Sequence, residues 1–243
     1  MSDAARRGCP HLNIKSAARC ATALEAMSRC PPTLHVLVAT IGRGGPHGLL
    51  RLLGSLEPQL HAGDALTIVY DARDDAHTRM YVAVVAHRLT QRGVAVRVEW
   101  NATNMGIGEA VRSHWGPLLE RRDFVVHCDD DNVYVPGAFD RIRARIAEDR
   151  HEHGGRGDAL HIFRHTYKVE QWGMATLPWV WPLLPVVSRG FVDTGDGVVP
   201  YDVNARVAWP PRNGGDGEFY AGVAQLVPRV RHWPDVTFEY RCH

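Results

Sequence analysis

Lysine is almost absent from this sequence of 243 residues, which contains only Lys15 and Lys168. Arginine therefore supplies nearly all of the positive charge, and the 28 basic residues are balanced by 27 acidic ones. A protein whose main task is to cover a polyanion needs a clear excess of positive charge. The near-neutral balance argues against that class, although the planar guanidinium group of arginine binds diphosphates well.

Long apolar runs are missing as well. A membrane-spanning helix needs about 20 consecutive apolar residues, whereas the best candidate, from Leu177 to Val187, is short and broken by prolines. No apolar run follows Arg6 and Arg7, so we expect no signal peptide. The five cysteines are an odd number with irregular spacing, which does not indicate a disulfide framework. These absences predict a cytoplasmic protein without a transmembrane segment.

Strand and helix patterns alternate from residue 34 to residue 150. Short apolar, β-branched runs predict strands at 34–40, 65–70, 94–100 and 123–128, each followed by a segment with helical spacing. This order predicts an α/β fold with an open, Rossmann-like, mostly parallel sheet and helices on both faces. After residue 150 the pattern turns irregular, with a helix expected at 218–227 and a last strand at 236–240.

The domain organisation follows from these patterns. Residues 1–32 form an N-terminal extension, either flexible or carrying a short helix, which the Pro31-Pro32 pair ends. Residues 33–243 form a single domain. Within it, we expect a nucleotide-binding half over 33–135 and an acceptor-binding half over 136–243.

Polar residues follow the expected strands, at the point where each strand ends. Ligands of open α/β sheets bind beyond the carboxyl ends of the strands, so these residues should converge on one site. They are Thr40, Asp71, Asn104 and the run Asp129-Asp130-Asp131.

The three adjacent aspartates at 129–131 are the strongest chemical signal. Neighbouring carboxylates at the end of a buried strand repel one another and lose hydration, and a cation compensates both costs. Oxygen ligands of this kind suit Mg²⁺ or Mn²⁺, which also bind phosphates. The competing interpretation is an acidic loop that caps the following helix, because Asp131 and Asn132 lie near its start.

The segment Asp129-Asp130-Asp131 resembles the Asp-x-Asp motif of glycosyltransferases with the GT-A fold, and the span from Leu34 to Val227 is similar to the family-two-like pattern. This resemblance implies a metal-dependent enzyme that uses a nucleotide-sugar donor, a UDP-sugar being favoured. It implies that Asp131 ligates Mn²⁺ or Mg²⁺ and that Asp129 reaches the metal or the ribose. The implied donor-binding residues are Thr40, Asp71, Asn104, Gly106, Asp129 and Asp130.

A glycine-rich stretch around Asp216 is the second feature. Glycines allow close backbone approach to a ligand, and Asp216 as the N-cap of the next helix is an almost equally good interpretation. In similar enzymes an acidic residue here, often in a Glu-Asp pair, is the general base, which implies that role for Asp216, with Glu218 in reserve. Gly215 replaces the first acid of that pair. Direct attack assisted by one base implies inversion at the anomeric carbon.

Several alternatives stay open at this stage. A sugar-nucleotide nucleotidyltransferase shares the sheet and the metal, and a catalytically inactive nucleotide-sugar-binding module would keep only the pocket. The hydroxyl acceptor is a saccharide, a lipid or a protein, or, as the less favoured option, a modified DNA base. Outward arginines on the helix after residue 137 would hold an anionic acceptor, together with Arg121 and Arg122. These outward arginines are Arg141, Arg143 and Arg145.

Three histidines are further candidates for the site. His165 is expected to face it, and His232 and His243 are candidates to complete the metal shell.

Overall fold

The computed structural model describes residues 31–40, 45–71, 76–100, 105, 108–169, 179–180, 187, 192–212 and 214–242. The predictions for the N-terminal extension up to residue 30, for Asn104, Gly106 and for His243 lie outside these described residues. Among the described helices, none combines the length and the apolar character that crossing a membrane requires.

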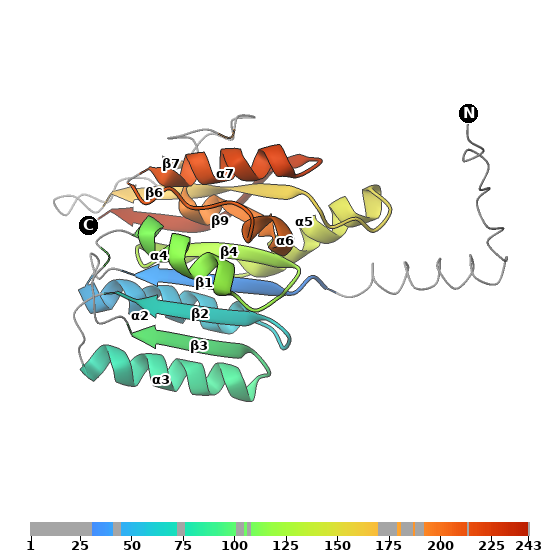
Figure 1. The fold of residues 1–243 in the computed structure, drawn as a ribbon. Helices are drawn as coiled ribbons and strands as arrows, with labels where there is room; N and C mark the ends of the chain where they lie inside the picture. The colour runs from blue at the N-terminus through green and yellow to red at the C-terminus, as the bar shows by residue number, and fades with distance from the viewer. Residues whose placement is uncertain are drawn as a thin grey trace, which may run out of the picture.

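The first half alternates strands and helices as the sequence predicts (Figure 1). Its elements are β1 (Leu34–Thr40), α2 (Gly45–Leu56), the 3₁₀ turn η1 (Glu57–Gln59), β2 (Ala65–Tyr70), α3 (Ala76–Gln91), β3 (Ala95–Trp100), α4 (Gly108–Trp115), the 3₁₀ turn η2 (Gly116–Leu118) and β4 (Phe124–Asp129).

The second half is less regular than the first. Its elements are β5 (Asn132–Tyr134), α5 (Ala138–Glu152), β6 (Leu160–Val169), β7 (Trp179–Val180), the 3₁₀ turn η3 (Thr194–Asp196), β8 (Gly197–Pro200), α6 (Tyr201–Asn204), α7 (Gly215–Leu226) and β9 (Val230–Cys242).

Two elements start earlier than the sequence predicts. The last strand begins at Val230, and α7 begins at Gly215. Gly214 occupies the N-cap of α7 in the left-handed region, with φ of 74°, a conformation that glycine adopts without the steric cost of a Cβ atom. Asp216 therefore lies in the first turn of the helix, and its interpretation as the N-cap was wrong.

Within the described residues, the central sheet has nine strands, in the order β3-β2-β1-β4-β8-β6-β9-β5, with β7 paired to β6. The four strands of the first half are all parallel, which confirms the predicted fold class. Antiparallel pairs enter in the second half, where β8 runs against both β4 and β6. This return of the chain brings the start of β8 beside the end of β4 and the first half of β6.

Both faces of the sheet are covered, so the central strands carry apolar side chains at successive positions. On β1, Val36 and Val38 pack into the core beneath α2, α3 and α5, whereas Leu37 and Ala39 pack toward α4. A third cluster, which includes Phe219 of α7, covers β6 and β8. Apolar packing against the helices thus holds the strands in place on both faces of the sheet, and the polar residues lie at its carboxyl edge.

Helix α5 corrects one prediction about the arginine-rich face. Arg143 does not point outward: its side chain is 6% exposed and forms an ion pair with Asp64. Asp64 in turn accepts hydrogen bonds from the backbone N–H groups of Leu34 (2.9 Å) and His61 (2.8 Å). Helical spacing alone does not show that a guanidinium group has a buried carboxylate partner far away in the sequence. Here the Arg143–Asp64 pair connects α5 to the beginnings of β1 and β2.

Candidate active site

The register of the parallel strands brings the predicted site residues to one edge. Ala39 of β1 lies opposite Asp129 of β4, and Thr40 lies opposite Tyr70 of β2. The backbone N–H of Asp71 then donates a 2.7 Å hydrogen bond to the carbonyl oxygen of Thr40. Three strands therefore end side by side.

Thr40 and Asp130 contact each other directly, because the Thr40 hydroxyl donates a hydrogen bond to the Asp130 carboxylate. Both side chains are buried. A Cβ atom at Gly48 would lie 2.8 Å from the Asp130 carbonyl oxygen, so α2 packs tightly against this aspartate. Asp130 thus points into the protein, as expected for the middle residue of a three-aspartate turn.

Asp71 is fully buried at the end of β2. One of its carboxylate oxygens accepts a hydrogen bond from the backbone N–H of Met105. The other, Oδ1, has no hydrogen-bond partner among the described residues. This leaves one acceptor at the position where the resemblance places the nucleotide.

Asp129 is bound by Arg112, a residue that no motif in the sequence marks. The Arg112 side chain comes from α4, is 1% exposed and forms an ion pair with Asp129. Its guanidinium carbon lies 4.9 Å from the centre of the Trp209 ring, in a cation–π contact. A Cβ atom at Gly108 would lie 3.1 Å from Arg112 Nη1 and 3.3 Å from Asp129 Oδ1, so glycine at this position makes room for the pair.

Asp131 has the properties of a carboxylate that lacks its counter-charge. Burial, followed by the charge of Asp130, raises its pKa to about 6. Tyr240 hydrogen-bonds the Asp131 side chain, yet Oδ1 is buried and has no hydrogen-bond partner among the described residues. A divalent cation would satisfy this oxygen and remove the electrostatic cost. The residues present therefore fit Mn²⁺ or Mg²⁺.

Asp216 lies half-buried in the first turn of α7. Burial is the main reason that the pKa of its carboxyl is raised, and the charge of Arg112 partly opposes this shift. Its neighbour on the helix differs: Glu218 is held by Arg212, with nitrogen–oxygen distances of 2.7 and 2.5 Å. Of the two candidate bases, Asp216 has the carboxylate that forms no ion pair with any residue in the described part of the chain.

Two further aspartates reach this site from a segment for which the sequence predicted only short strands and loops. Burial, followed by the charge of Asp196, raises the pKa of Asp193 to about 7, and the charges of Asp216 and Asp131 act in the same direction. Asp196 accepts a 2.8 Å hydrogen bond from Nδ1 of His165. No motif marks these residues, because they depend on the return of β8 beside β4.

The histidines predicted for the site separate into different groups. His165 is buried and paired with Asp196, and its ring stacks on Phe238 at 5.0 Å. His232 lies near the start of β9, whereas Tyr240, which contacts Asp131, lies near its end. His232 is therefore too far along the strand to complete a metal shell at Asp131, and that prediction was wrong.

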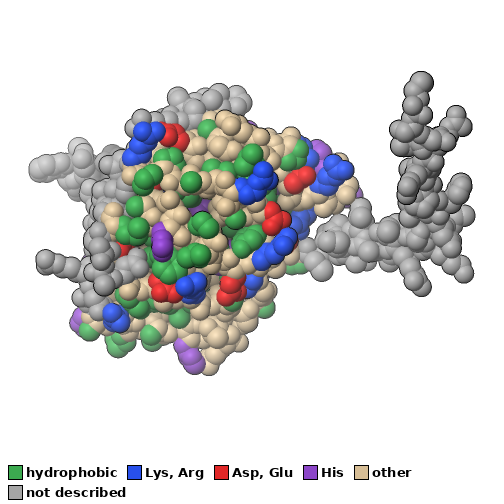
Figure 2. Space-filling model, viewed as in Figure 1, with side chains coloured by type: hydrophobic (Ala, Val, Ile, Leu, Met, Phe, Trp, Pro, Cys, Tyr) green, Lys and Arg blue, Asp and Glu red, His purple; other side chains and the backbone are tan. Residues whose placement is uncertain are grey.

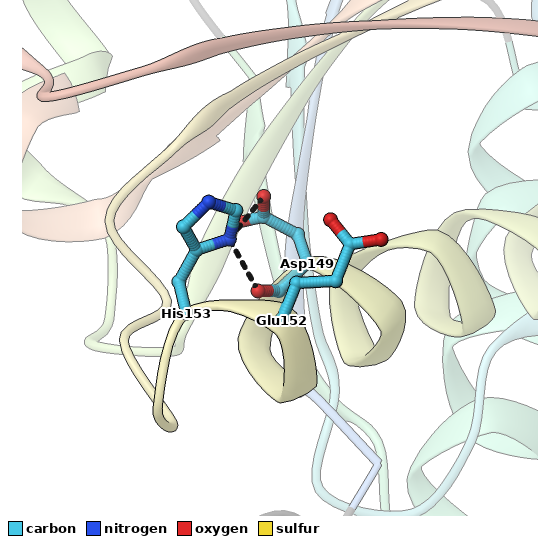
Figure 3. A group of neighbouring side chains, drawn as sticks. All are labelled: Asp149, Glu152 and His153. Carbon is cyan, nitrogen blue, oxygen red and sulfur yellow. Dashed lines mark hydrogen bonds and ion pairs between the residues drawn. The ribbon is translucent and has the colours of Figure 1, made fainter.

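A second group of metal-type side chains lies at the other end of the sheet. Asp149, Glu152 and His153, on α5 and at its C-terminal end, place one ligand atom each within 4.8 Å of one another (Figure 3). The buried Asp149, however, forms ion pairs with Arg229 at 3.2 Å and Arg231 at 3.3 Å. Two guanidinium groups already supply positive charge there, so the group is better explained as an ion-pair network.

Acidic and basic side chains are mixed over the described part of the face that Figure 2 shows. Arginines that were candidates for an anion-binding face have acidic partners: Arg121 pairs with Asp202 at 3.1 Å, and Arg122 pairs with Glu120 at 3.2 Å. Arg145 is held 2.8 Å from the carboxylates of both Glu148 and Asp235. Internal pairing thus accounts for much of the arginine content.

Two hollows in the surface lie away from these carboxylates, each with a volume of about 640 Å³. One lies between α2 and the start of α5, where Ser55 and Tyr134 line it. The other lies at the opposite end of β4 from the aspartates, beside Asp123 and Arg150. Neither hollow is lined by the candidate site residues. We therefore locate the candidate site from the charges and hydrogen bonds of its aspartates.

Comparison with solved structures identifies the fold. Residues 1–349 of TarS from S. aureus match with a TM-score of 0.59 and 12% identity, over 86% of this chain and 60% of that one, both alone and in complex with UDP. The mannosyltransferase PcManGT from Pyrobaculum calidifontis, in complex with GDP-Man and Mn²⁺, matches with a TM-score of 0.57 and 11% identity, over 94% of this chain and 65% of that one.

The chain therefore has a glycosyltransferase fold, as its sequence predicts. It spans less than two thirds of the length of these structures. No protein family and no curated protein matches the sequence.

Proposed function

We propose that this protein is a metal-dependent glycosyltransferase that moves a sugar from a nucleoside-diphosphate sugar to an acceptor hydroxyl group. The observation that carries the proposal is that Asp131 and Asp216 lie near enough to Asp193 for both charges to act on it, at one edge of a glycosyltransferase fold. Asp131, Asp193 and Asp216 come from the β4–β5 turn, the turn before β8 and the first turn of α7, respectively. Carboxylates that lie near one another repel, which raises their pKa values, and such perturbed groups are typical of functional sites.

Asp131 is the residue that would hold the divalent cation, because its buried Oδ1 has no hydrogen-bond partner among the described residues. Mn²⁺ or Mg²⁺ bound there would neutralise the charge on the diphosphate leaving group. Asp129 contributes less directly, since Arg112 already binds one of its oxygens. We propose that Asp129 fixes the shape of the aspartate turn and hydrogen-bonds the ribose or a metal-bound water.

Asp216 is the proposed general base. It would accept the proton of the acceptor hydroxyl while the hydroxyl oxygen attacks the anomeric carbon and the bond from that carbon to the diphosphate oxygen breaks. Burial raises the pKa of Asp216, which makes its carboxylate a stronger proton acceptor. Attack from the face opposite the leaving group produces inversion. Glu218 is the weaker candidate because Arg212 holds its carboxylate.

Thr40, Asp71, Asn104 and Gly106 would lie along the nucleotide. Oδ1 of Asp71, which has no hydrogen-bond partner among the described residues, supports this placement, because it can accept a hydrogen bond from a ring N–H of a pyrimidine base. Asp130 supports the donor pocket through Thr40. A UDP-sugar is the favoured donor, and the TarS structure with UDP and the PcManGT structure with GDP-Man make uridine and guanosine nucleotides the first to test.

The acceptor is proposed to be a hydroxyl of a saccharide, lipid or protein. The ion pairs of Arg122, Arg143 and Arg145 favour this class over a modified DNA base, because their positive charge is already neutralised within the chain. A DNA acceptor would instead require binding that weakens steeply as salt is raised.

Release of the nucleoside diphosphate tests the proposal. We would incubate the protein with Mn²⁺ and UDP-glucose, UDP-N-acetylglucosamine or GDP-mannose, and expect slow release of UDP or GDP by hydrolysis, faster with an acceptor. Asp131→Ala should abolish release, and Asp216→Asn should suppress transfer while nucleotide binding remains. Asp202→Asn is the matched control, because Asp202 is 72% exposed in a surface ion pair.

The other outcomes separate the alternatives. Release of pyrophosphate from a nucleoside triphosphate and a sugar phosphate would identify a nucleotidyltransferase. Nucleotide binding without any release would identify a binding module. Failure of all three nucleotide sugars to bind in the presence of Mn²⁺ would reject the proposal for these donors.

A further inference from the structure

The short turn that leads into β8 forms one wall of the site. Strand β8 runs antiparallel to β4, with Val126 opposite Val198, and antiparallel to β6, with Ile162 opposite Gly197. The residues just before Gly197 therefore lie beyond the carboxyl end of β4, beside the aspartate turn. We call residues 193–197 the β8 entry turn.

The β8 entry turn is fixed from several sides. Asp196, which is 2% exposed, accepts one hydrogen bond from Nδ1 of His165 and another from the backbone N–H of Asp193, both 2.8 Å long. The Tyr220 hydroxyl of α7 donates a 2.5 Å hydrogen bond to the carbonyl oxygen of Thr194. The turn is thus connected to β6 and to the helix that carries Asp216.

Close packing leaves this turn little freedom. A Cβ atom at Gly195 would lie 2.8 Å from the Phe238 ring and 3.0 Å from Nδ2 of Asn132, the residue directly after the three aspartates. A bulkier residue at 195 would push the turn away from β5 and β9. The backbone of Asp193 is therefore held in one place relative to both the aspartate turn and α7.

Asp193 is the acidic residue of this turn that lies near enough to the other carboxylates for their charges to act on it. Its side chain is half-buried and caps the η3 turn: it accepts a 3.4 Å hydrogen bond from the backbone N–H of Gly195 and a second one from the backbone N–H of Asp196, which completes a capping box. The charges of Asp131 and Asp216 both act on it. An ionised carboxylate has about four acceptor sites, so these two backbone donors leave Asp193 capacity to accept hydrogen bonds from a ligand.

The position of the transferred sugar rests on the proposed function. In a direct displacement the leaving oxygen lies near the cation-binding Asp131, and the attacking hydroxyl lies near the base Asp216. The sugar that is transferred must lie between them, next to the residue that neighbours both. We propose that Asp193 accepts hydrogen bonds from hydroxyl groups of the transferred sugar, and that the His165–Asp196 pair positions it.

Paired binding measurements test this inference. The affinities of UDP and UDP-glucose, and of GDP and GDP-mannose, would be measured by calorimetry with Mn²⁺ for the wild-type protein, Asp193→Ala and the surface control Asp202→Asn. Loss of a hydrogen bond to a charged group weakens binding roughly tenfold or more. We expect Asp193→Ala to weaken binding of the nucleotide sugar by about that factor and to change the affinity of the matching diphosphate less than about twofold.

A second comparison tests the positioning role. His165→Ala should weaken binding of the nucleotide sugar in the same selective way, and the double variant with Asp193→Ala should be no weaker than Asp193→Ala alone. Residues that act through one another are non-additive in this manner. A merely structural role for His165 would instead lower both affinities and add to the effect of Asp193→Ala. Melting temperatures of every variant establish that the protein is folded.

The results that overturn the inference are distinct from those that overturn the proposed function. Equal losses for diphosphate and nucleotide sugar would make Asp193 a metal ligand or a structural residue, and no loss for either would show that it does not contact the sugar. If the wild-type protein binds neither diphosphate, the proposed function fails and the inference fails with it.

Discussion

Arg112 is almost completely buried, yet it donates a charge-assisted hydrogen bond to Asp129, whose side chain is 28% exposed at the edge of the site. A buried cation thus lies directly beneath the aspartate turn, covered on one side by the Trp209 ring. Its charge opposes the rise in pKa of both Asp131 and Asp216. Arg112 is therefore a permanent counter-charge in a site that otherwise collects negative charge.

Breaking this pair should destabilise the protein. Removal of one member of a buried ion pair leaves the other charge without a partner, and partial exposure of Asp129 moderates the cost. We expect Arg112→Gln to lower the free energy of unfolding by about 2 to 3 kcal/mol, measured by urea denaturation. Arg121→Gln, in an ion pair whose side chains are 77% and 72% exposed, should cost less than about 0.5 kcal/mol.

A double-mutant cycle decides whether the effect belongs to the pair. With Asp129→Asn as the second change, a coupling energy of about 1 kcal/mol or more is expected for residues in direct contact. Additive losses would show that Arg112 stabilises the protein through Trp209 alone.

Removal of the Asp131 charge should stabilise the fold in the absence of metal and abolish stabilisation by metal and nucleotide. Burial makes the charged carboxylate costly, as its raised pKa indicates, so in the presence of EDTA Asp131→Asn should stabilise the fold by about 1 kcal/mol at pH 7. The same variant should lose the increase in melting temperature that Mn²⁺ and UDP or GDP give the wild-type protein. A variant that is destabilised in EDTA would show that Asp131 has a structural partner instead.

Glycine is required at position 197, where β8 passes beneath α7. A Cβ atom there would overlap the Tyr220 ring, so Gly197→Ala should displace Tyr220 and the first turn of α7. We expect a loss of about 3 kcal/mol in the free energy of unfolding, the upper range for overpacking, together with loss of transfer. Gly54→Ala is the control: Gly54 is exposed on α2, where alanine should stabilise by about 0.5 to 1 kcal/mol. Similar effects of both changes would contradict the packing argument.

Acid should destabilise the core through its neutral histidines. Burial, together with the charges of nearby arginines, lowers the pKa of His161 to about 4, and burial and Arg112 lower that of His127 to about 3. Below the unfolded-state pKa of about 6.5 the unfolded chain binds protons that the folded chain excludes. The contribution of these two histidines to the free energy of unfolding is therefore complete above pH 6.5. It falls as the pH approaches 4, and at pH 5 it is smaller by about 2 kcal/mol for each histidine.

His161→Asn isolates one of these contributions. Asparagine retains an acceptor near the position of His161 Nδ1, which accepts a 3.1 Å hydrogen bond from Nε1 of Trp233, but it does not titrate. The difference in unfolding free energy between pH 7 and pH 5 should be smaller for this variant than for the wild-type protein or for His87→Asn on the exposed side of α3. An equal difference in all three would assign the acid sensitivity elsewhere.

Parts of the candidate site could be predicted because they depend on local patterns. The β-branched runs and the helical spacing between them fix a parallel sheet, and in such a sheet Thr40, Asp71 and Asp129 have to end at the same edge. The prediction for Arg143 was wrong for a related reason. Helical spacing indicates which residues share a face, but it does not reveal that Asp64, 79 positions away in the sequence, binds that arginine.

By itself, then, the sequence determined the α/β class, the aspartate turn and the glycine-rich start of α7, because each is encoded within a few neighbouring residues. Only the tertiary structure decided that Arg112 and Asp193 belong to the candidate site and that His165, which the sequence predicts to face it, is paired there with Asp196. Asp193 and His165 are brought there by the return of β8 between β4 and β6, and Arg112 by the packing of α4 onto Trp209. Such long-range pairing depends on the whole core being buried at once, and no local pattern of residues encodes it.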